Sequence, residues 1–370
     1  MNKIFAIGLM SGTSRDGIDA AIIYTDGEEA SIFSEFITIP YNKETRKILS
    51  IACDNKKLNS CEVIDAEIAI TIAHAEAVAQ LLDKAGMKAS EVDVIGFHGH
   101  TIEHDPANKF SNQIGDAEYL AQATKINVVY DFRSADISAG GQGAPLTPAF
   151  HASVFKNLES PIVILNLGGV ANATWIGEKF DIKVSNFDEI AAFDVGPGCA
   201  LLDDWVHSRR GWAFDPGGIL AASGKVDKVI LSSLMSDSYF SKLPPKSLDR
   251  DVFDLSSLSK LSDADGAATI AQFTTSAIVH SITQMPTKPK KLFVSGGGRY
   301  NKTIMLSLNA CLGLPVETIE SVGMDGDAIE AQAFAWLAVR SIYGLPLSYP
   351  STTGVKAPMT GGKLVYANSN

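Results

Sequence analysis

A cluster of glycine and hydroxyl residues near the N-terminus constrains the fold of this 370-residue chain more than any other feature. The stretch GLMSGTSRDGIDAAI, residues 8–22, joins two apolar segments, 3–9 and 18–25, that are each typical of a strand. A tight hairpin turn needs only two residues, and this one is longer, with small residues and hydroxyls added. Its consecutive backbone amides suit an anion. A decorated hairpin loop and a ligand-binding turn both fit this stretch taken alone.

The same arrangement returns later in the chain. Residues 1–133 predict the order βββαβαβ, and residues 160–177 again give a strand, a Gly-rich turn and a strand, followed by a second helix–strand series. Two series that each begin with a hairpin indicate an internal duplication. The length exceeds that at which one core usually stops growing. We therefore expect an α/β protein with two domains, 1–133 plus 346–370 and 134–345.

Composition excludes several classes of partner. The net charge of −11 argues against a nucleic-acid ligand, because phosphate backbones require basic surfaces. The four cysteines are scattered without metal-ligand or CxxC spacing, which favours free thiols in a reducing cytoplasm. No apolar run is long enough for a signal peptide or a membrane span. We expect a cytoplasmic protein whose partners are small molecules.

Two further Gly-rich turns follow apolar strands. NLGGVAN contains Gly168, Gly169 and Asn172, and SGGGRYN contains the run 296–298, which is Gly296, Gly297 and Gly298. Neither turn, nor the first, has the Gly-Lys-Ser/Thr of a Walker motif or a GxGxxG run followed by a helix. Three such turns suit a nucleotide whose phosphates lie between two domains and whose base lies beside the third turn.

Polar residues follow other apolar strands. Asp194 ends the strand in AAFDVGPGCALLDDW, where a carboxylate can act as a general base or can cap the next helix. Asp131 and Arg133 end another strand, at a position where open α/β sheets bind ligands or where a linker carries an ion pair. Glu330 lies one turn into a predicted helix, 326–344. A structural role, as a helix cap or in an ion pair, therefore stays open for these residues beside a role in binding or catalysis.

Histidines cluster in GFHGHTIEHDP, where the strand 92–99 is expected to open into a loop. His98 and His100 could share a face, and His104 lies beyond them. No cysteine or second ligand cluster is near in the sequence, so contacts to substrate or to neighbouring residues are favoured over a zinc site.

Together these motifs closely resemble the anhydro-N-acetylmuramic acid kinase family along nearly the whole chain. The matching segments are GLMSGTSRDGIDAA, FHGHT, QIGDAEYLA, DFRSADISAGGQGAPLTPAFH, NLGGVAN, FDVGPGCALLDDW, SGGG and DAIEAQAFAWLA. The resemblance implies the duplicated ribonuclease H-like fold of sugar kinases, actin and Hsp70, with ATP in the interdomain cleft. It also implies an Mg²⁺-dependent kinase of peptidoglycan recycling that opens the 1,6-anhydro ring with water and phosphorylates O6, and that forms a homodimer.

The resemblance also implies roles for residues. It makes Asp194 the base that activates water. The nucleotide would contact Gly12, Thr13, Ser14, Asp16, Gly17, Gly168, Gly169, Asn172, Gly296, Gly297 and Gly298. The sugar would contact His98, Thr101, Asp131, Arg133 and Glu330. The ligands of the metal stay unassigned.

Three positions depart from the family pattern. His100 stands where the family usually has Gln, Cys199 where it has Asn, and Arg15 where it commonly has Leu. The changes at His100 and Cys199 leave room for another sugar or acyl phosphotransferase of the same fold. A nucleotide-binding sensor without catalysis is a second alternative, which the retained Asp194, Arg133 and three Gly-rich turns disfavour.

Overall fold

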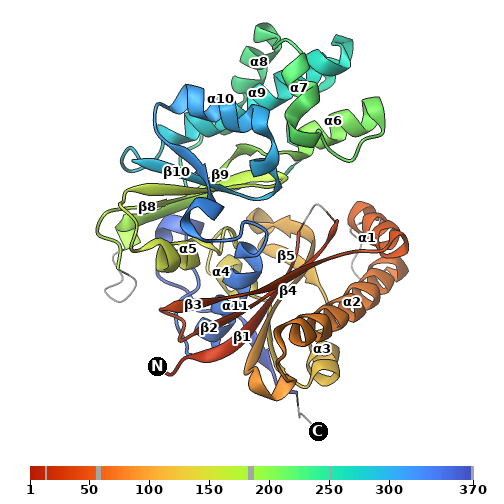
Figure 1. The fold of residues 1–370 in the computed structure, drawn as a ribbon, viewed down its shortest axis with the longest axis vertical. Coiled ribbons are helices and arrows are strands. Elements are labelled where there is room, and N and C mark those ends of the chain that lie inside the picture. Colours follow the sequence, from red (N-terminus) through yellow and green to blue (C-terminus); the bar gives the residue numbers. More distant parts are fainter. Residues whose placement is uncertain (13–14, 56–59, 182–186, 251, 368–370) are drawn as a thin grey trace. The chain divides into compact units, whose positions relative to one another are not determined.

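The computed structural model describes residues 1–12, 15–55, 60–181, 187–250 and 252–367 (Figure 1). The chain forms two compact units. Unit 1 consists of Met1–Lys156, Asp181–Ser185 and Asp327–Asn370, and unit 2 consists of Asn157–Phe180 and Asn186–Gly326.

Unit 1 is built on a mixed sheet. Its strands are β1 (Ile4–Ser11), β2 (Gly17–Thr25), β3 (Ala30–Pro40), β4 (Val94–Asp105), β5 (Phe110–Ile114), β6 (Asn127–Tyr130) and β12 (Lys363–Val365). Its α-helices are α1 (Lys43–Asn55), α2 (Cys61–Ala85), α3 (Ala117–Thr124), α4 (Ser134–Ser138), α5 (Pro148–Phe155), α11 (Ile329–Ile342) and α12 (Pro350–Thr353). The order is β12-β6-β4-β1-β2-β3, with β5 paired to β4. Strands β1, β2 and β3 are antiparallel neighbours, and β4 and β6 run parallel to β1.

Unit 2 repeats this topology. Its strands are β7 (Ile162–Leu167), β8 (Val170–Ile176), β9 (Ile190–Pro197), β10 (Lys291–Ser295) and β11 (Val316–Thr318). Its α-helices are α6 (Ala200–Arg210), α7 (Ile219–Ser223), α8 (Lys228–Met235), α9 (Asp263–Ile282) and α10 (Lys302–Leu312). The order β9-β8-β7-β10-β11 has the same strand directions as β3-β2-β1-β4-β6. The duplicated α/β fold expected from the sequence is confirmed.

Glycines let α11 pack against the sheet of unit 1. Side chains alternate between the faces of a strand. On β1, Ile7 and Leu9 join the same hydrophobic cluster as residues of α2, while Gly8 lies against α11. A Cβ at Gly8 would lie 1.7 Å from the Ala331 carbonyl oxygen, and one at Gly96 on β4 would lie 2.1 Å from that of Phe334. The sheet therefore touches the helix backbone directly.

This packing corrects the expected domain boundaries. Residues 134–156 and 327–345 were expected in the second domain, but both lie in unit 1. Helix α11 contacts β1, β2 and β4, and α5 contacts α11. The local helix pattern cannot show this, because strands β1, β2 and β4, against which α11 packs, lie more than 200 residues earlier in the chain.

Two local expectations also need correction. The strand that was expected to end at residue 99 continues as β4 to Asp105 and pairs with β5, so His100 and His104 lie on the same strand as His98 and not in a loop. Helix α1 follows β3 directly and was not predicted. Helix α2 was predicted, and it starts at the N-cap Ser60 and ends at Gly86, whose φ is +65°.

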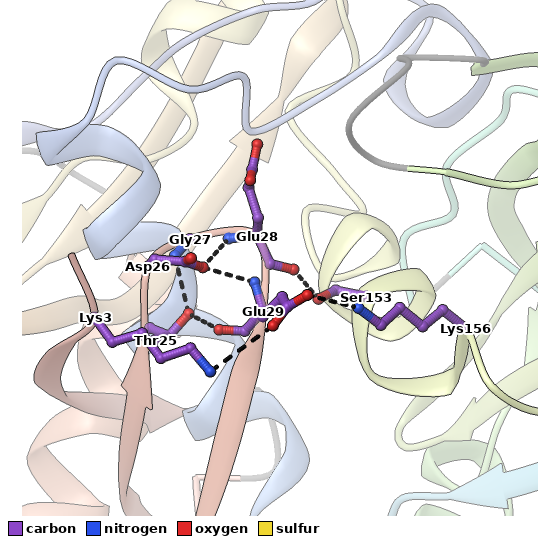
Figure 2. Close-up of polar contacts among 8 residues, drawn as sticks. All are labelled: Lys3, Thr25, Asp26, Gly27, Glu28, Glu29, Ser153 and Lys156. Carbon is purple, nitrogen blue, oxygen red and sulfur yellow. Dashed lines mark hydrogen bonds and ion pairs between the residues drawn. The ribbon is translucent and has the colours of Figure 1, made fainter. Parts of the chain in front are cut away.

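The turn between β2 and β3 anchors α5 within unit 1 (Figure 2). Ser153 Oγ donates to the carbonyl of Glu28 at 2.6 Å, and Lys156 Nζ forms an ion pair with Glu29 at 3.3 Å. Asp26 accepts hydrogen bonds from the amides of both acidic residues. This end of the β2–β3 hairpin is therefore fixed to the last helix before the chain enters unit 2.

We predict that Gly96→Ala lowers the free energy of unfolding by about 3 kcal/mol, because the new methyl group overlaps the α11 backbone, which cannot move without losing its other contacts. Denaturant titration followed by circular dichroism measures this. Gly297→Ala is the matched control, because no atom lies within 4 Å of its Cβ position. Equal stability of the two variants would contradict the packing argument.

Candidate functional site

The β1–β2 turn contains the first group of predicted nucleotide residues. The amide of Arg15 donates to the Gly12 carbonyl at 3.1 Å, and Arg15 has a φ of +56°. Gly17 is required where it stands, since a Cβ there would lie 2.4 Å from the Ile39 carbonyl oxygen. Asp16 lies between them and is exposed. Thr13 and Ser14, which were also predicted to contact nucleotide, lie outside the described residues.

Arg15 does not simply point to solvent. Its Nη1 donates to Ser50 Oγ of α1 at 3.1 Å. The departure from the family pattern at this position therefore ties the turn to α1.

Asp19 on β2 is a candidate site residue that the sequence analysis did not single out. Burial raises the pKa of its carboxyl to about 7, against a hydrogen bond from Thr38, and the charges of Glu330, Asp16 and Asp327 raise it further. A buried carboxylate with like charges around it marks a candidate functional position. The available signal was a single acidic residue inside the apolar strand IDAAII.

His98, Arg133 and Glu330 come together in unit 1. His98 Nδ1 donates to the Gly99 carbonyl at 2.9 Å, and its Nε2 accepts from Arg133 Nη2 at 2.8 Å. Burial and the Arg133 charge hold the pKa of His98 well below its usual range, so the ring is neutral. Burial raises the pKa of Glu330, and the Arg133 charge opposes this. With both ring nitrogens engaged, His98 is a hydrogen-bonding partner and not a metal ligand.

The loop after α4 is fixed around Arg133. Arg133 Nη1 donates to the Gly143 carbonyl at 2.6 Å, and the Gly143 amide donates to Asp136 Oδ1 at 2.6 Å. The buried Asp136 also accepts from Ser348 and Thr353. One buried carboxylate with several donors therefore orders the loop 140–145, which lies within the matching segment DFRSADISAGGQGAPLTPAFH.

Two other predicted sugar contacts have partners of their own. Asp131 forms an ion pair with Lys363 at 2.8 Å and accepts from the Ser134 amide. Thr101 Oγ1 accepts from Gln113 at 3.3 Å. Their roles toward a sugar stay predictions.

The predicted glycines of unit 2 meet at one place. The amides of Gly198 and Cys199 donate to the carbonyls of Gly169 and Gly168 at 3.0 and 2.7 Å, so the β7–β8 turn is joined to the start of α6. A Cβ at Gly298 would lie 2.3 Å from Leu167 Cγ and 2.7 Å from Cys199 Sγ.

The third turn packs there too. A Cβ at Gly296, which has a φ of +76°, would lie 2.4 Å from Asn166 Oδ1, whereas Gly297 faces open space. Burial raises the pKa of the Cys199 thiol to about 12, so it is an inert packing group between the turns. The three Gly-rich segments of unit 2 thus form one close-packed backbone surface.

Asp194 lies on β9 opposite Asn172 of β8. Its amide donates to the Lys246 carbonyl at 3.0 Å, its own carbonyl accepts from the Tyr239 hydroxyl, and its Oδ2 accepts from the Leu248 amide at 2.8 Å. The segment 239–248, which includes part of η5 (Ser238–Ser241), therefore fixes both the backbone and the carboxylate. Sequence reasoning found Asp194 but not this support, which comes from about 50 residues further along the chain.

The arrangement offers amides for phosphate in both units, a fixed carboxylate in unit 2, and a cation beside a neutral histidine in unit 1. Among the residues with assigned coordinates, no three His, Cys, Asp or Glu side chains are placed to hold a metal ion. In the same part of the chain, every helix is too short or too polar to cross a bilayer.

Comparison with known proteins supports one family. The family model for anhydro-N-acetylmuramic acid kinase matches residues 4–367. The chain is similar to the anhydro-N-acetylmuramic acid kinases of Rhodospirillum rubrum, with 48% identity over 97% of this chain and 93% of that protein, and of Zymomonas mobilis, with 44% identity over 98% and 100%. Among solved structures it resembles the activator of the 2-hydroxyisocaproyl-CoA dehydratase from Clostridium difficile, with 10% identity, a TM-score of 0.45, and coverage of 92% and 97%.

We predict that Asp19→Asn raises the free energy of unfolding by about 2 kcal/mol at pH 8 and leaves it nearly unchanged at pH 4. The pKa of Asp19 lies above its unfolded value, so the folded state loses stability as pH rises from about 4 to about 7. The amide keeps the acceptor for Thr38 and carries no charge. Urea titrations at both pH values measure the change, with Asp65→Asn, at an exposed carboxylate on α2, as control; a stability loss at pH 8 would contradict the burial of a charge at Asp19.

Proposed function

The chain belongs to the anhydro-N-acetylmuramic acid kinase family, and from this premise we propose that it uses ATP and water to convert anhydro-N-acetylmuramic acid to N-acetylmuramic acid 6-phosphate. Water adds to C1, the C1–O6 bond breaks, and O6 takes the γ-phosphoryl group as ADP leaves. The proton from water passes to a base. The two halves assist each other, because ring opening places negative charge on O6 and phosphoryl transfer consumes it.

The placement of Asp194 carries this proposal. A general base must be held in a fixed orientation, and the Leu248 amide fixes the Oδ2 atom of this carboxylate at 2.8 Å. Tyr239 and Lys246 hold its backbone on both sides. We assign Asp194 as the base that takes the proton from the attacking water.

The Gly-rich segments are assigned to ATP. Amides of the β1–β2 turn and of Gly168 and Gly169 suit phosphate, and the open side of Gly297 lets the backbone approach adenosine closely. His98, Arg133 and Glu330 are assigned to the sugar, because a guanidinium held by two partners presents a fixed donor to an anionic or hydroxyl group.

The acidic residues of unit 1 suit Mg²⁺. The charges of Asp16, Asp327 and Glu330 lie close enough to Asp19 to raise its pKa. A divalent cation offsets that repulsion. Mg²⁺ is usually held by one or two carboxylates together with substrate phosphates, so a preformed set of three ligands is not required. We propose Asp16 and Asp19 as its carboxylates; the cation neutralises charge on the phosphoryl group being transferred.

We predict that Asp194→Asn lowers kcat by at least about 1,000-fold, since it removes the base and keeps the side-chain shape. The Kd for a non-hydrolysable ATP analogue, measured by calorimetry, should stay within about twofold. Product is followed by mass spectrometry with purified protein, ATP, Mg²⁺ and anhydro-N-acetylmuramic acid.

Asp204→Asn is the matched control, because this exposed carboxylate on α6 pairs with Arg250 and should leave both values unchanged. Unaltered turnover in Asp194→Asn would overturn the assignment of the base. Nucleotide binding by the unaltered protein without product from this sugar would overturn the assignment of the substrate.

A further inference from the structure

Tyr41 contacts both ends of the β1–β2 turn. It follows β3, and its amide donates to the Asp16 carbonyl at 2.9 Å, near the end of the turn. Its hydroxyl donates to Ser11 Oγ at 2.9 Å, where β1 ends and the turn begins. The side chain is 6% exposed, so one buried residue fixes the distance between the two ends.

The Ser11 hydroxyl is already engaged beneath the turn. Its second contact is with His100 Nδ1 of β4 at 3.0 Å, and His100 Nε2 lies 3.8 Å from Cys53 Sγ of α1. Since Tyr41 donates to Ser11, Ser11 donates to Nδ1, and the ring proton of His100 lies on Nε2 toward the sulfur. Tyr41, Ser11, His100 and Cys53 are all buried. They form a connected polar chain, which we call the turn brace.

Helix α1 adds contacts to the same turn. Arg46 Nη2 donates to the Asp16 carbonyl at 3.0 Å, and Arg15 reaches Ser50. Asp16 therefore has two donors on one carbonyl, both from the segment 41–46. The turn is therefore held from the side of α1.

The position of His100 indicates a structural role for this residue. The histidine cluster was expected to contact either substrate or neighbouring residues, and the His100 side chain, which is 0% exposed, has protein partners at both ring nitrogens. Burial lowers the pKa of His100 to about 3, and the Arg15 charge adds to this, so the ring is neutral at working pH. A neutral ring with one acceptor and one donor completes the brace.

We propose that Tyr41 is a positioning residue for ATP, which fixes Ser11 and the Asp16 carbonyl, at the two ends of the phosphate-binding β1–β2 turn, at one separation. The inference rests on the proposed nucleotide role of that turn. Fixing the two ends of a turn before a ligand binds removes part of the ordering cost from the binding step. Ser11 is thus assigned as an anchor and not as a phosphate ligand.

Tyr41→Phe tests the proposal, because it removes one hydroxyl and keeps the ring. We expect the Kd for a non-hydrolysable ATP analogue with Mg²⁺ to rise about five- to tenfold, the effect of one buried hydrogen bond. The KM for the sugar should stay within about twofold, since the change acts on the turn alone. Isothermal titration calorimetry gives the Kd and initial rates give the KM.

A double-mutant cycle separates a brace from a direct ligand. Ser11→Ala breaks the same chain, so the Tyr41→Phe/Ser11→Ala double variant should bind the analogue within about twofold of the weaker single variant. If Ser11 contacts phosphate directly, Ser11→Ala weakens binding while Tyr41→Phe does not, and the proposal is overturned. Additive losses would also overturn it.

Two further variants complete the test. Tyr343→Phe is the matched control, because its hydroxyl donates to the Asn2 carbonyl, at the opposite end of β1. It should leave the Kd unchanged. His100→Gln should restore most of the binding that His100→Leu loses, since an amide can again accept from Ser11.

The outcomes distinguish the two levels of the account. An equal loss of nucleotide and sugar binding in Tyr41→Phe, together with a lower Tm, would indicate a general structural role and would overturn the brace. Absence of nucleotide binding by the unaltered protein would overturn the proposed function and the brace together. If Tyr41→Phe raises the Kd as expected but the unaltered protein does not turn over the sugar, the brace stands and only the assignment of the substrate is overturned.

Discussion

Direct contact between the unit 1 sheet and the backbone of α11 is the constraint on which the candidate site in that unit depends. Gly8 and Gly96 leave no side chain between the two layers, so the start of α11 is held at a fixed depth against β1 and β4. Glu330 lies in the first turn of that helix. Its charge raises the pKa of Asp19 on β2, and the charge of Arg133 opposes the rise that burial causes in the pKa of Glu330 itself. A larger residue at either glycine would move the acidic end of the helix away from the strands that supply its partners.

Much of the fold could be predicted because its strands and turns are local in sequence. Apolar runs gave the β1–β2 and β7–β8 hairpins, and their repetition gave the duplication that the two matching sheets confirm. The unit to which α11 belongs could not be predicted, because a helical pattern shows which face is apolar but not which sheet that face packs against. The extension of β4 through His100 to Asp105 was missed because its residues are polar and its partner β5 is needed to form it.

Candidate site residues could be proposed from the sequence only where a polar residue or a glycine cluster follows an apolar strand. Asp194, Arg133 and the Gly-rich turns were proposed as candidates in this way, and the Gly-rich segments of unit 2 pack together as a backbone surface. The supports of these residues were not found. Tyr239 reaches Asp194 from 45 residues away, and Tyr41 reaches Ser11 from 30, so neither pairing leaves a local pattern. Such long-range hydrogen bonds to carbonyls and hydroxyls are set by tertiary structure alone.

The central claim is that one site couples attack of water on the sugar to phosphorylation of O6. Mass spectrometry of the product formed from anhydro-N-acetylmuramic acid, ATP and Mg²⁺ in ¹⁸O-labelled water tests it most directly. The account predicts one ¹⁸O atom at C1 and an unlabelled phosphate ester at O6, with product read before the anomeric oxygen exchanges with solvent. Phosphorylated sugar that retains the anhydro ring, or label in the phosphoryl group, would contradict the coupled reaction.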